Sequence, residues 1–121
     1  MKHFSLVVCT VFCLGLCPSS VQAEPPTINS DGEPFKTPVF VGGTDGYHTY
    51  RIPALVVSKK GTLLAFCEGR KTGRSDHGDL DLVLKRSTDN GKTWGKQILV
   101  HEEGGESKIT IGNPCPVVDQ S

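Results

Sequence analysis

The residues best suited to chemistry in this chain are two arginines, an aspartate and an asparagine: Arg51, Arg70, Asp76 and Asn113. A planar guanidinium pairs with a carboxylate through two parallel hydrogen bonds, so arginines are suited to holding an acidic ligand. A carboxyl group acts as a general acid near neutral pH only where its surroundings raise its pKa. These residues can serve one ligand only if the fold brings them together.

The elements that must position them are short β-type runs. From Val39 onward such runs alternate with glycine and polar turns, and no segment keeps helical spacing over three turns. The sequence therefore predicts an all-β fold. The expected strands are Val39–Val41, Tyr50–Ser58, Thr62–Gly69, Leu80–Ser87, Gln97–His101 and Asn113–Asp119.

Two turn signals set the expected order of pairing. Lys59-Lys60-Gly61 and Asp89-Asn90-Gly91-Lys92 are typical of hairpin turns, so consecutive strands should pair antiparallel. The alternating strand directions then place the four polar residues named above at one end of the sheet and Ser87 at the other. Eight-residue strands, at about 3.3 Å per residue, separate the two ends by some 25 Å.

Prolines indicate where the first of these strands lies. Pro53 has no N–H group to donate to a central ladder, which favours an edge strand or a bulge. Pro114 and Pro116 recur at the same point of the next apparent unit, as a repeat would require. The inner strand of a propeller blade and the edge of a sandwich or meander explain these prolines equally well.

The beginning of the chain is typical of a secretory signal peptide. A basic start at Met1–His3 precedes the apolar run Phe4–Leu16 and the small-residue pattern Val21-Gln22-Ala23. We expect cleavage after Ala23 and a secreted or periplasmic location. The apolar run is shorter than the ~20 residues of a spanning helix, so no membrane span is expected. Residues 1–23 are thus the signal peptide, 24–38 a disordered leader and 39–121 the folded part.

The charge balance does not favour a nucleic-acid partner, and the cysteine count leaves the pairing of two thiols open. The chain has 13 Lys+Arg and 13 Asp+Glu, a balance that does not favour a nucleic-acid partner. Beyond the signal peptide only Cys67 and Cys115 remain. They could pair in an oxidising compartment, but their apolar surroundings favour two buried free thiols. Two cysteines form no zinc site, and no metal or cofactor is expected.

Two segments resemble the exo-α-sialidases (neuraminidases) of bacterial and animal type. The Arg-Ile-Pro motif of that family is matched by Tyr50-Arg51-Ile52-Pro53-Ala54-Leu55. A complete Asp-box, Ser-x-Asp-x-Gly-x-Thr-Trp, is matched by Ser87-Thr88-Asp89-Asn90-Gly91-Lys92-Thr93-Trp94. Between them lie Phe66-Cys67-Glu68-Gly69-Arg70 and Asp76, in the order the family has. The resemblance covers Val39 to about Asp119.

The resemblance implies a six-bladed sialidase-type β-propeller. The strands from Tyr50 to His101 occupy about the length of one blade, roughly 40–50 residues, and Asn113 would open a second. A closed propeller needs at least about four blades. The chain is therefore expected to be the incomplete N-terminal part of a propeller.

The resemblance also assigns roles in binding terminal sialic acids of glycans. Arg51 matches one of three arginines that hold the sugar carboxylate, and Arg70 matches the arginine near the 4-hydroxyl. Asn113 matches a pocket position that is often aspartate in bacterial members, and here the sequence departs from the family. Without the resemblance, the arginines could be ordinary cations and Asn113 a turn former.

Asp76 is the candidate acid/base residue, 25 positions after Arg51 in the polar loop 71–79. Its competitors are Asp79, Asp81 and His77. The resemblance implies a retaining hydrolysis in which a glutamate activates a tyrosine nucleophile.

The family takes that tyrosine, that glutamate and two further arginines from later blades. Tyr47 and Tyr50 stand too early in the chain to be the nucleophile. The chain alone is therefore expected to be inactive.

The Asp-box has a structural reading. Asp89 can accept backbone hydrogen bonds within its own turn, Gly91 can adopt a positive φ, and Trp94 can pack between sheets, while Ser87 and Thr93 complete the motif. Two other functions stay open: a non-catalytic Asp-box propeller that binds glycans or proteins, and an exported structural or adhesion protein with no sugar site.

Overall fold

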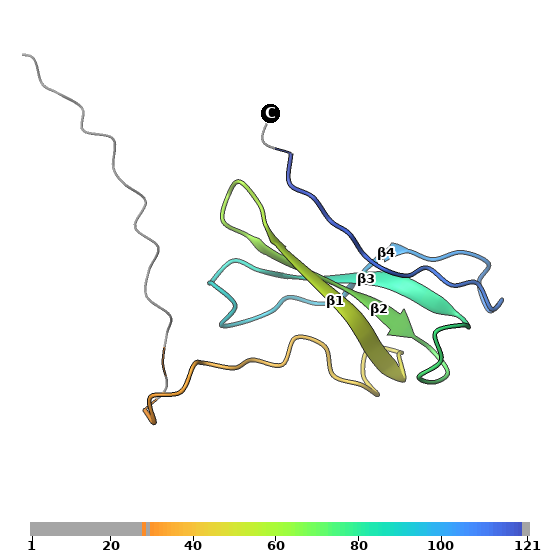
Figure 1. The fold of residues 1–121 in the computed structure, drawn as a ribbon, viewed down its shortest axis with the longest axis horizontal. Coiled ribbons are helices and arrows are strands. Elements are labelled where there is room, and N and C mark those ends of the chain that lie inside the picture. The colour runs from red at the N-terminus through yellow and green to blue at the C-terminus, as the bar shows by residue number, and fades with distance from the viewer. Residues whose placement is uncertain (1–27, 29, 120–121) are drawn as a thin grey trace, which may run out of the picture. The chain divides into compact units, whose positions relative to one another are not determined.

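The computed structural model describes residues 28 and 30–119, and within them the chain is all-β, as the sequence predicts. Four strands form one antiparallel sheet in the order β1-β2-β3-β4: β1 Thr49–Val57, β2 Leu63–Arg70, β3 Leu80–Ser87 and β4 Ile98–His101. The turn between β1 and β2 and the loop between β2 and β3 lie at opposite ends of this sheet (Figure 1). The predicted consecutive pairing of these strands is therefore confirmed.

The chain divides into two compact units at Phe35 and Lys36. In the first, the described residues contain one isolated bridge between Ile28 and Pro34. The predicted signal peptide lies outside the described residues, and so does part of the predicted leader. The second unit contains the sheet.

The hairpin between β1 and β2 forms as the turn residues predict. The amide of Ser58 donates to the carbonyl of Thr62 at 2.9 Å, and the amide of Gly61 donates to the carbonyl of Ser58 at 2.9 Å. Gly61 has φ +79°, a left-handed conformation that costs glycine little. The turn aligns Val57 with Leu63 and so fixes the register of the first pair.

A bulge interrupts β1 at its proline. Arg51 pairs with Glu68 and Ala54 with Phe66, so Ile52 and Pro53 together oppose one residue of β2. A proline cannot donate to the ladder, and a bulge on an edge strand accommodates it. Ile52 has φ +55°, which is rare for a β-branched residue. The predicted irregularity at Pro53 is confirmed.

One face of the sheet holds the small core. Cys67 and Val83 lie opposite each other on β2 and β3, and both are buried with Tyr47. Phe40 and Tyr50 pack against this cluster, with a ring-centroid separation of 5.1 Å. Burying a valine side chain such as that of Val83 stabilises the fold by roughly 1.5–3 kcal/mol.

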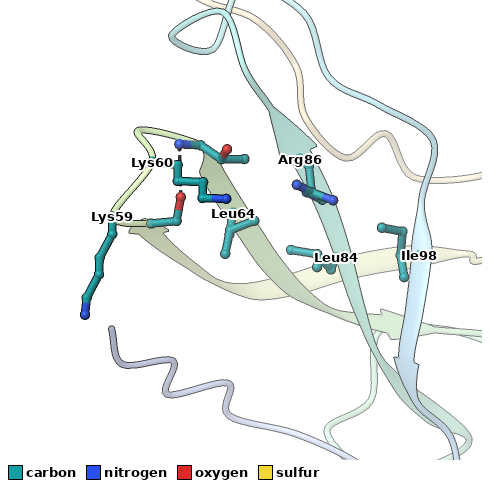
Figure 2. Close-up of a pocket in the computed structure, with 8 residues that line it drawn as sticks. Lys59, Lys60, Leu64, Leu84, Arg86 and Ile98 are labelled. Carbon is teal, nitrogen blue, oxygen red and sulfur yellow. Dashed lines mark hydrogen bonds between the residues drawn. The ribbon is translucent and has the colours of Figure 1, made fainter. Parts of the chain in front are cut away.

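The opposite face is open towards the β1–β2 turn. A hollow of about 510 Å³ is lined there by Leu64, Leu84, Ile98 and the basic residues Lys60 and Arg86, among others. Figure 2 shows the three apolar side chains side by side across three strands. This hollow contains no carboxylate in its lining and shares no lining residue with the polar hollow described below.

Two predicted strands are wrong. Residues 39–41 and 113–119 contain no strand. An extended, apolar run becomes a strand only when a partner completes its hydrogen bonds. No strand of the described part of the chain pairs with either segment, and Pro114 and Pro116 also lack the N–H groups that a ladder needs.

The cysteines differ from each other. Both are free thiols, and Cys67 is buried while Cys115 is exposed. The expectation of two buried thiols is therefore wrong for Cys115, which lies in the run 113–119 that forms no strand. Burial raises the pKa of the Cys67 thiol to about 11. The protonated thiol donates to the carbonyl of Arg51 at 3.0 Å, within the bulge of β1.

Within residues 28 and 30–119, the structure contains no helix that is both long and apolar enough to cross a membrane.

Candidate functional site

The structure brings Arg51, Arg70 and Asp76 together at one rim of the sheet. Oδ1 of Asp76 lies 2.6 Å from Nη1 of Arg51 and 2.8 Å from Nη1 of Arg70. One carboxylate oxygen therefore joins an arginine of β1 to an arginine of β2. The two arginines belong to different strands, and Asp76 belongs to the loop that follows β2.

Strand register explains this meeting. Arg51 lies directly opposite Glu68, and Glu68 and Arg70 are two positions apart on β2. Side chains alternate between the faces of a strand, so all three share one face. The loop that carries Asp76 closes back on the sheet because the amide of Lys71 donates to the carbonyl of Asp79 at 3.2 Å.

The two arginines differ in exposure. The side chain of Arg51 is 42% exposed, and that of Arg70 is 2% exposed. Nη1 of Arg70 also donates to the carbonyls of Arg74 and Ser75, at 2.7 and 2.6 Å. Arg70 is thus buried among loop carbonyls, whereas Arg51 faces solvent.

Glu68 is a site residue that the sequence analysis did not single out. It is 3% exposed, and its Oε2 accepts hydrogen bonds from Nη2 and Nε of Arg70 at 2.6 and 3.2 Å. Its Oε1 accepts from the backbone N–H of Asn113 at 2.9 Å. A charged residue two positions before Arg70, on the same face of a strand, was the signal available in the sequence.

Asn113 reaches the rim through its backbone. It has φ +54°, a left-handed conformation that asparagine tolerates well. Beside it, a Cβ added to Gly112 would lie 2.7 Å from Oε1 of Glu68. The segment around Asn113 therefore fits against Glu68 only because residue 112 has no side chain.

These residues enclose a polar hollow of about 320 Å³ at the rim. Its lining is Arg51, Ile52, Glu68, Arg70, Asp76, Thr110, Gly112 and Asn113. All four residues predicted to bind or transform a ligand are in this lining. It combines two guanidinium groups, which suit an acidic group, with two carboxylates, which accept hydrogen bonds.

The arginines set the ionisation of Asp76. The hydrogen bond from Arg70 and the charge of Arg51 hold the pKa of the Asp76 carboxyl below its usual range. Burial opposes the charged form of Arg70, but its bonds to Glu68 and Asp76 outweigh that and raise its pKa. In this structure Asp76 is an ionised partner of two arginines.

The competing acids lie elsewhere. Asp79 and Asp81 are buried and share the ammonium of Lys71, at 3.1 and 3.4 Å. Oδ2 of Asp81 also accepts from the hydroxyl of Tyr47 at 2.6 Å, beneath the core face. Neither acid lines the polar hollow. Asp76 is therefore the aspartate that the fold presents at the rim.

The Asp-box lies at the other end of the sheet, since Ser87 pairs with Leu63 at the start of β2. Oδ1 and Oδ2 of Asp89 accept from the backbone N–H and the hydroxyl of Thr93, at 2.9 and 2.6 Å. The hydroxyl of Ser87 donates to Oδ1 of Asp89 at 2.7 Å and accepts from the amide of Gly91 at 2.9 Å.

The Asp-box turn therefore binds itself. Hydrogen bonds from Thr93 and Ser87 lower the pKa of Asp89 to about 2. Gly91 has φ +83°. Trp94 lines an apolar hollow on the core face with Phe40 and Ala65, among others.

No cluster of three or more metal-ligating side chains occurs in the part of the chain that the structure describes.

The fold and the rim together define an antiparallel sheet that presents arginines and a carboxylate at one end, an arrangement consistent with a blade of a β-propeller. No family model matches the chain. Individual relatives do match. An exo-alpha-sialidase from Arthroderma benhamiae is 44% identical over 77 residues, which are 61% of this chain and 19% of the relative. A sialidase from Micromonospora viridifaciens is 42% identical over 111 residues, which are 88% of this chain and 17% of the relative.

A mammalian relative matches as well. Sialidase-2 from Mus musculus is 40% identical over 80 residues, which are 62% of this chain and 21% of the relative. This chain spans about a fifth of the length of each of these relatives. The chain belongs to the sialidase family, and its four-stranded sheet is consistent with a sialidase propeller blade.

Proposed function

We propose that this chain forms the first part of the sugar site of a secreted exo-α-sialidase, which hydrolyses terminal sialic acids from glycoconjugates with retention of configuration. The supporting observation is the meeting of Arg51 and Asp76 at 2.6 Å on the rim of the sheet. The similarity to sialidases of fungi, bacteria and mammals supports the same substrate class.

In this proposal Arg51 receives the carboxylate of the sugar. Its guanidinium is partly exposed and is paired with the carboxylate of Asp76. In the free structure Asp76 thus occupies a position that the carboxylate of a ligand could take. Arg70 and Asn113 line the same hollow and border the ring of the bound sugar.

Asp76 is proposed to protonate the leaving oxygen. The arginines lower its pKa in the free structure, which favours the ionised form. A ligand carboxylate on Arg51 would displace Asp76 from that guanidinium and add a negative charge beside it. Both changes raise the pKa of Asp76, so substrate binding itself would convert it towards a general acid.

The nucleophile and its activating glutamate are proposed to come from residues outside this chain, so that the chain alone is inactive. The hydroxyl of Tyr47 donates to Asp81, and that of Tyr50 donates to Gln97 at 2.9 Å. Both tyrosines pack on the core face, away from the polar hollow. A tyrosine nucleophile suits this substrate because a neutral group approaches an anionic sugar with less repulsion.

The test expresses the reading frame that encodes this chain, as far as it extends, and assays the secreted product on a fluorogenic α-sialoside. Asp76→Asn should lower kcat/KM on the order of 10²-fold or more, since general acid catalysis typically contributes 10²–10⁴. Asp45→Asn is the matched control, because Asp45 is an exposed aspartate paired with Lys85 and tolerates the change at φ +54°.

Two outcomes would contradict the proposal: a product that binds no sialoside, or an Asp76→Asn variant with unchanged turnover. Binding without turnover would support the alternative of a non-catalytic propeller that recognises glycans through the same rim.

A further inference from the structure

Arg70 makes more contacts than a ligand-binding arginine needs. A guanidinium carries five N–H hydrogens. Nε and Nη2 donate to Glu68, and Nη1 faces the carbonyls of Arg74 and Ser75 and the carboxylate of Asp76. At most one hydrogen, on Nη2, is left for a ligand. Among the residues that the structure describes, the guanidinium of Arg51 has one partner, Asp76.

Glu68 is the buried carboxylate that pairs with Arg70. Its side chain is 4% exposed, and a carboxylate at that depth is costly unless it is paired. Oε2 takes two bonds from Arg70, while Oε1 takes the amide of Asn113. Removing either charge of a buried pair leaves the other uncompensated, so Glu68 and Arg70 act as one unit.

The Glu68–Arg70 pair contacts the loop that carries Asp76. The carbonyls of Arg74 and Ser75 immediately precede Asp76, and both accept from Nη1 of Arg70 at 2.7 Å or less. Ser75 in turn accepts from the amide of His77 through its hydroxyl at 3.1 Å. Hydrogen bonds therefore hold the loop at the two residues before Asp76 and at the residue after it.

We propose that Glu68 and Arg70 are positioning residues, a buried clamp that holds the loop of Asp76 in place and leaves Arg51 to receive the acidic group of the ligand. This inference rests on the proposed function for the roles of Asp76 and Arg51. It changes the expected role of Arg70 from a main ligand contact to a support for the proton donor. Glu68, through Asn113, also ties the segment 110–113 to the same support.

The first test needs no substitution. In the full chain, the Nε–H proton of Arg70 should exchange with solvent at least roughly tenfold more slowly than that of Arg51, because hydrogen bonds to charged groups protect it. Arginine side-chain NMR measures both rates in one sample. Equal rates would overturn the clamp.

The second test measures the NMR titration of the Asp76 carboxyl. The charged groups that face it are Arg51 on β1, Arg70 on β2 and His77 in its own loop. Glu68→Gln keeps the shape of the side chain but loses its charge, and Arg70→Lys keeps a charge but loses the fork. Arg70→Lys should raise the titration midpoint of Asp76, because it removes the hydrogen-bonding fork that lowers it. Glu68→Gln also removes a negative charge near Asp76, so its effect on the clamp is judged by amide exchange.

The same variants should speed amide exchange at His77 and Gly78 by roughly tenfold. The matched controls are Glu103→Gln and Arg86→Lys, which make the same chemical changes at exposed positions. Midpoints and exchange rates like those of the controls would overturn the proposal. No sialoside is used, so a clamp that is present in a protein without sialidase activity would refute the proposed function alone.

Discussion

The two ends of this sheet each present an aspartate with a lowered pKa, and the two differ in what lowers it. Asp89 is held by neutral donors of its own turn, Ser87 and Thr93. Asp76 is held by two guanidinium groups from separate strands. Neutral donors within one turn stabilise the conformation of that turn. An arginine from a separate strand can instead exchange one carboxylate partner for another. The partners of an aspartate therefore indicate its role better than its exposure does.

Ligand binding should show the largest difference between the ends. Arg51→Lys removes the planar fork and should weaken binding of a methyl α-sialoside by roughly 10–100-fold, since a lysine cannot pair with a carboxylate through two parallel bonds. NMR titration of the product of the full reading frame measures the affinity. Arg86→Lys, near the Asp-box end, should leave it unchanged, and an equal loss in both variants would remove the distinction.

Stability should show the reverse pattern. Asp89→Ala removes the acceptor that closes the Asp-box turn and should lower the melting temperature by roughly 4–8 °C. Asp76→Ala removes a carboxylate that is 69% exposed and should change it by less than about 2 °C, because ion pairs of solvent-exposed carboxylates contribute little and Arg70 keeps its pairing with Glu68. Thermal unfolding followed by circular dichroism compares them. A larger loss of melting temperature in Asp76→Ala than in Asp89→Ala would contradict the view that the Asp-box end, and not the rim, stabilises the fold.

Two glycines allow the same contrast without a change of charge. Gly91→Ala forces a side chain into a left-handed conformation and should destabilise the fold by about 1–2 kcal/mol. Gly112→Ala places a Cβ 2.7 Å from Oε1 of Glu68, so it should shift the titration midpoint of Asp76 with a smaller change in stability. Chemical unfolding and carboxyl NMR measure the two effects. Identical responses would contradict the assignment of the two ends.

The smallest expected effects are a pH dependence of the stabilisation by Asp89 and a salt dependence of the titration of Asp76. The folded state prefers ionised Asp89, with its pKa lowered from 3.8 to about 2. Its stabilisation is therefore complete above about pH 4 and is lost as the pH falls towards 2. At about 1 M NaCl, where the screening length is about 3 Å, the midpoint of Asp76 should rise and that of Asp89 should stay. Carboxyl NMR at two salt concentrations separates charged from neutral partners.

The sequence predicted the parts of the fold that local chemistry determines. β2 and β3 follow from alternating apolar residues and hairpin turns, and the bulge follows from Pro53. The runs 39–41 and 113–119 were predicted wrongly, because alternation and apolar content do not show whether a partner strand exists.

The sequence predicted which residues meet at the rim, but not their burial, their pairing or their pKa shifts. Strand direction was enough to place Arg51, Arg70 and Asp76 at one end. The burial of Arg70 and the pairing of Glu68 depend on how the loop 71–79 folds back, which no local pattern encodes. The lowered pKa of Asp76 follows from those contacts and could not be read from its position in the chain.

The most direct test of the central claim follows the carboxyl signals of Asp76 and Asp89 while a methyl α-sialoside is added to the full chain. If the sugar carboxylate replaces Asp76 on Arg51, the titration midpoint of Asp76 should rise and that of Asp89 should not move. An unchanged midpoint at Asp76, or an equal shift at both aspartates, would contradict the account.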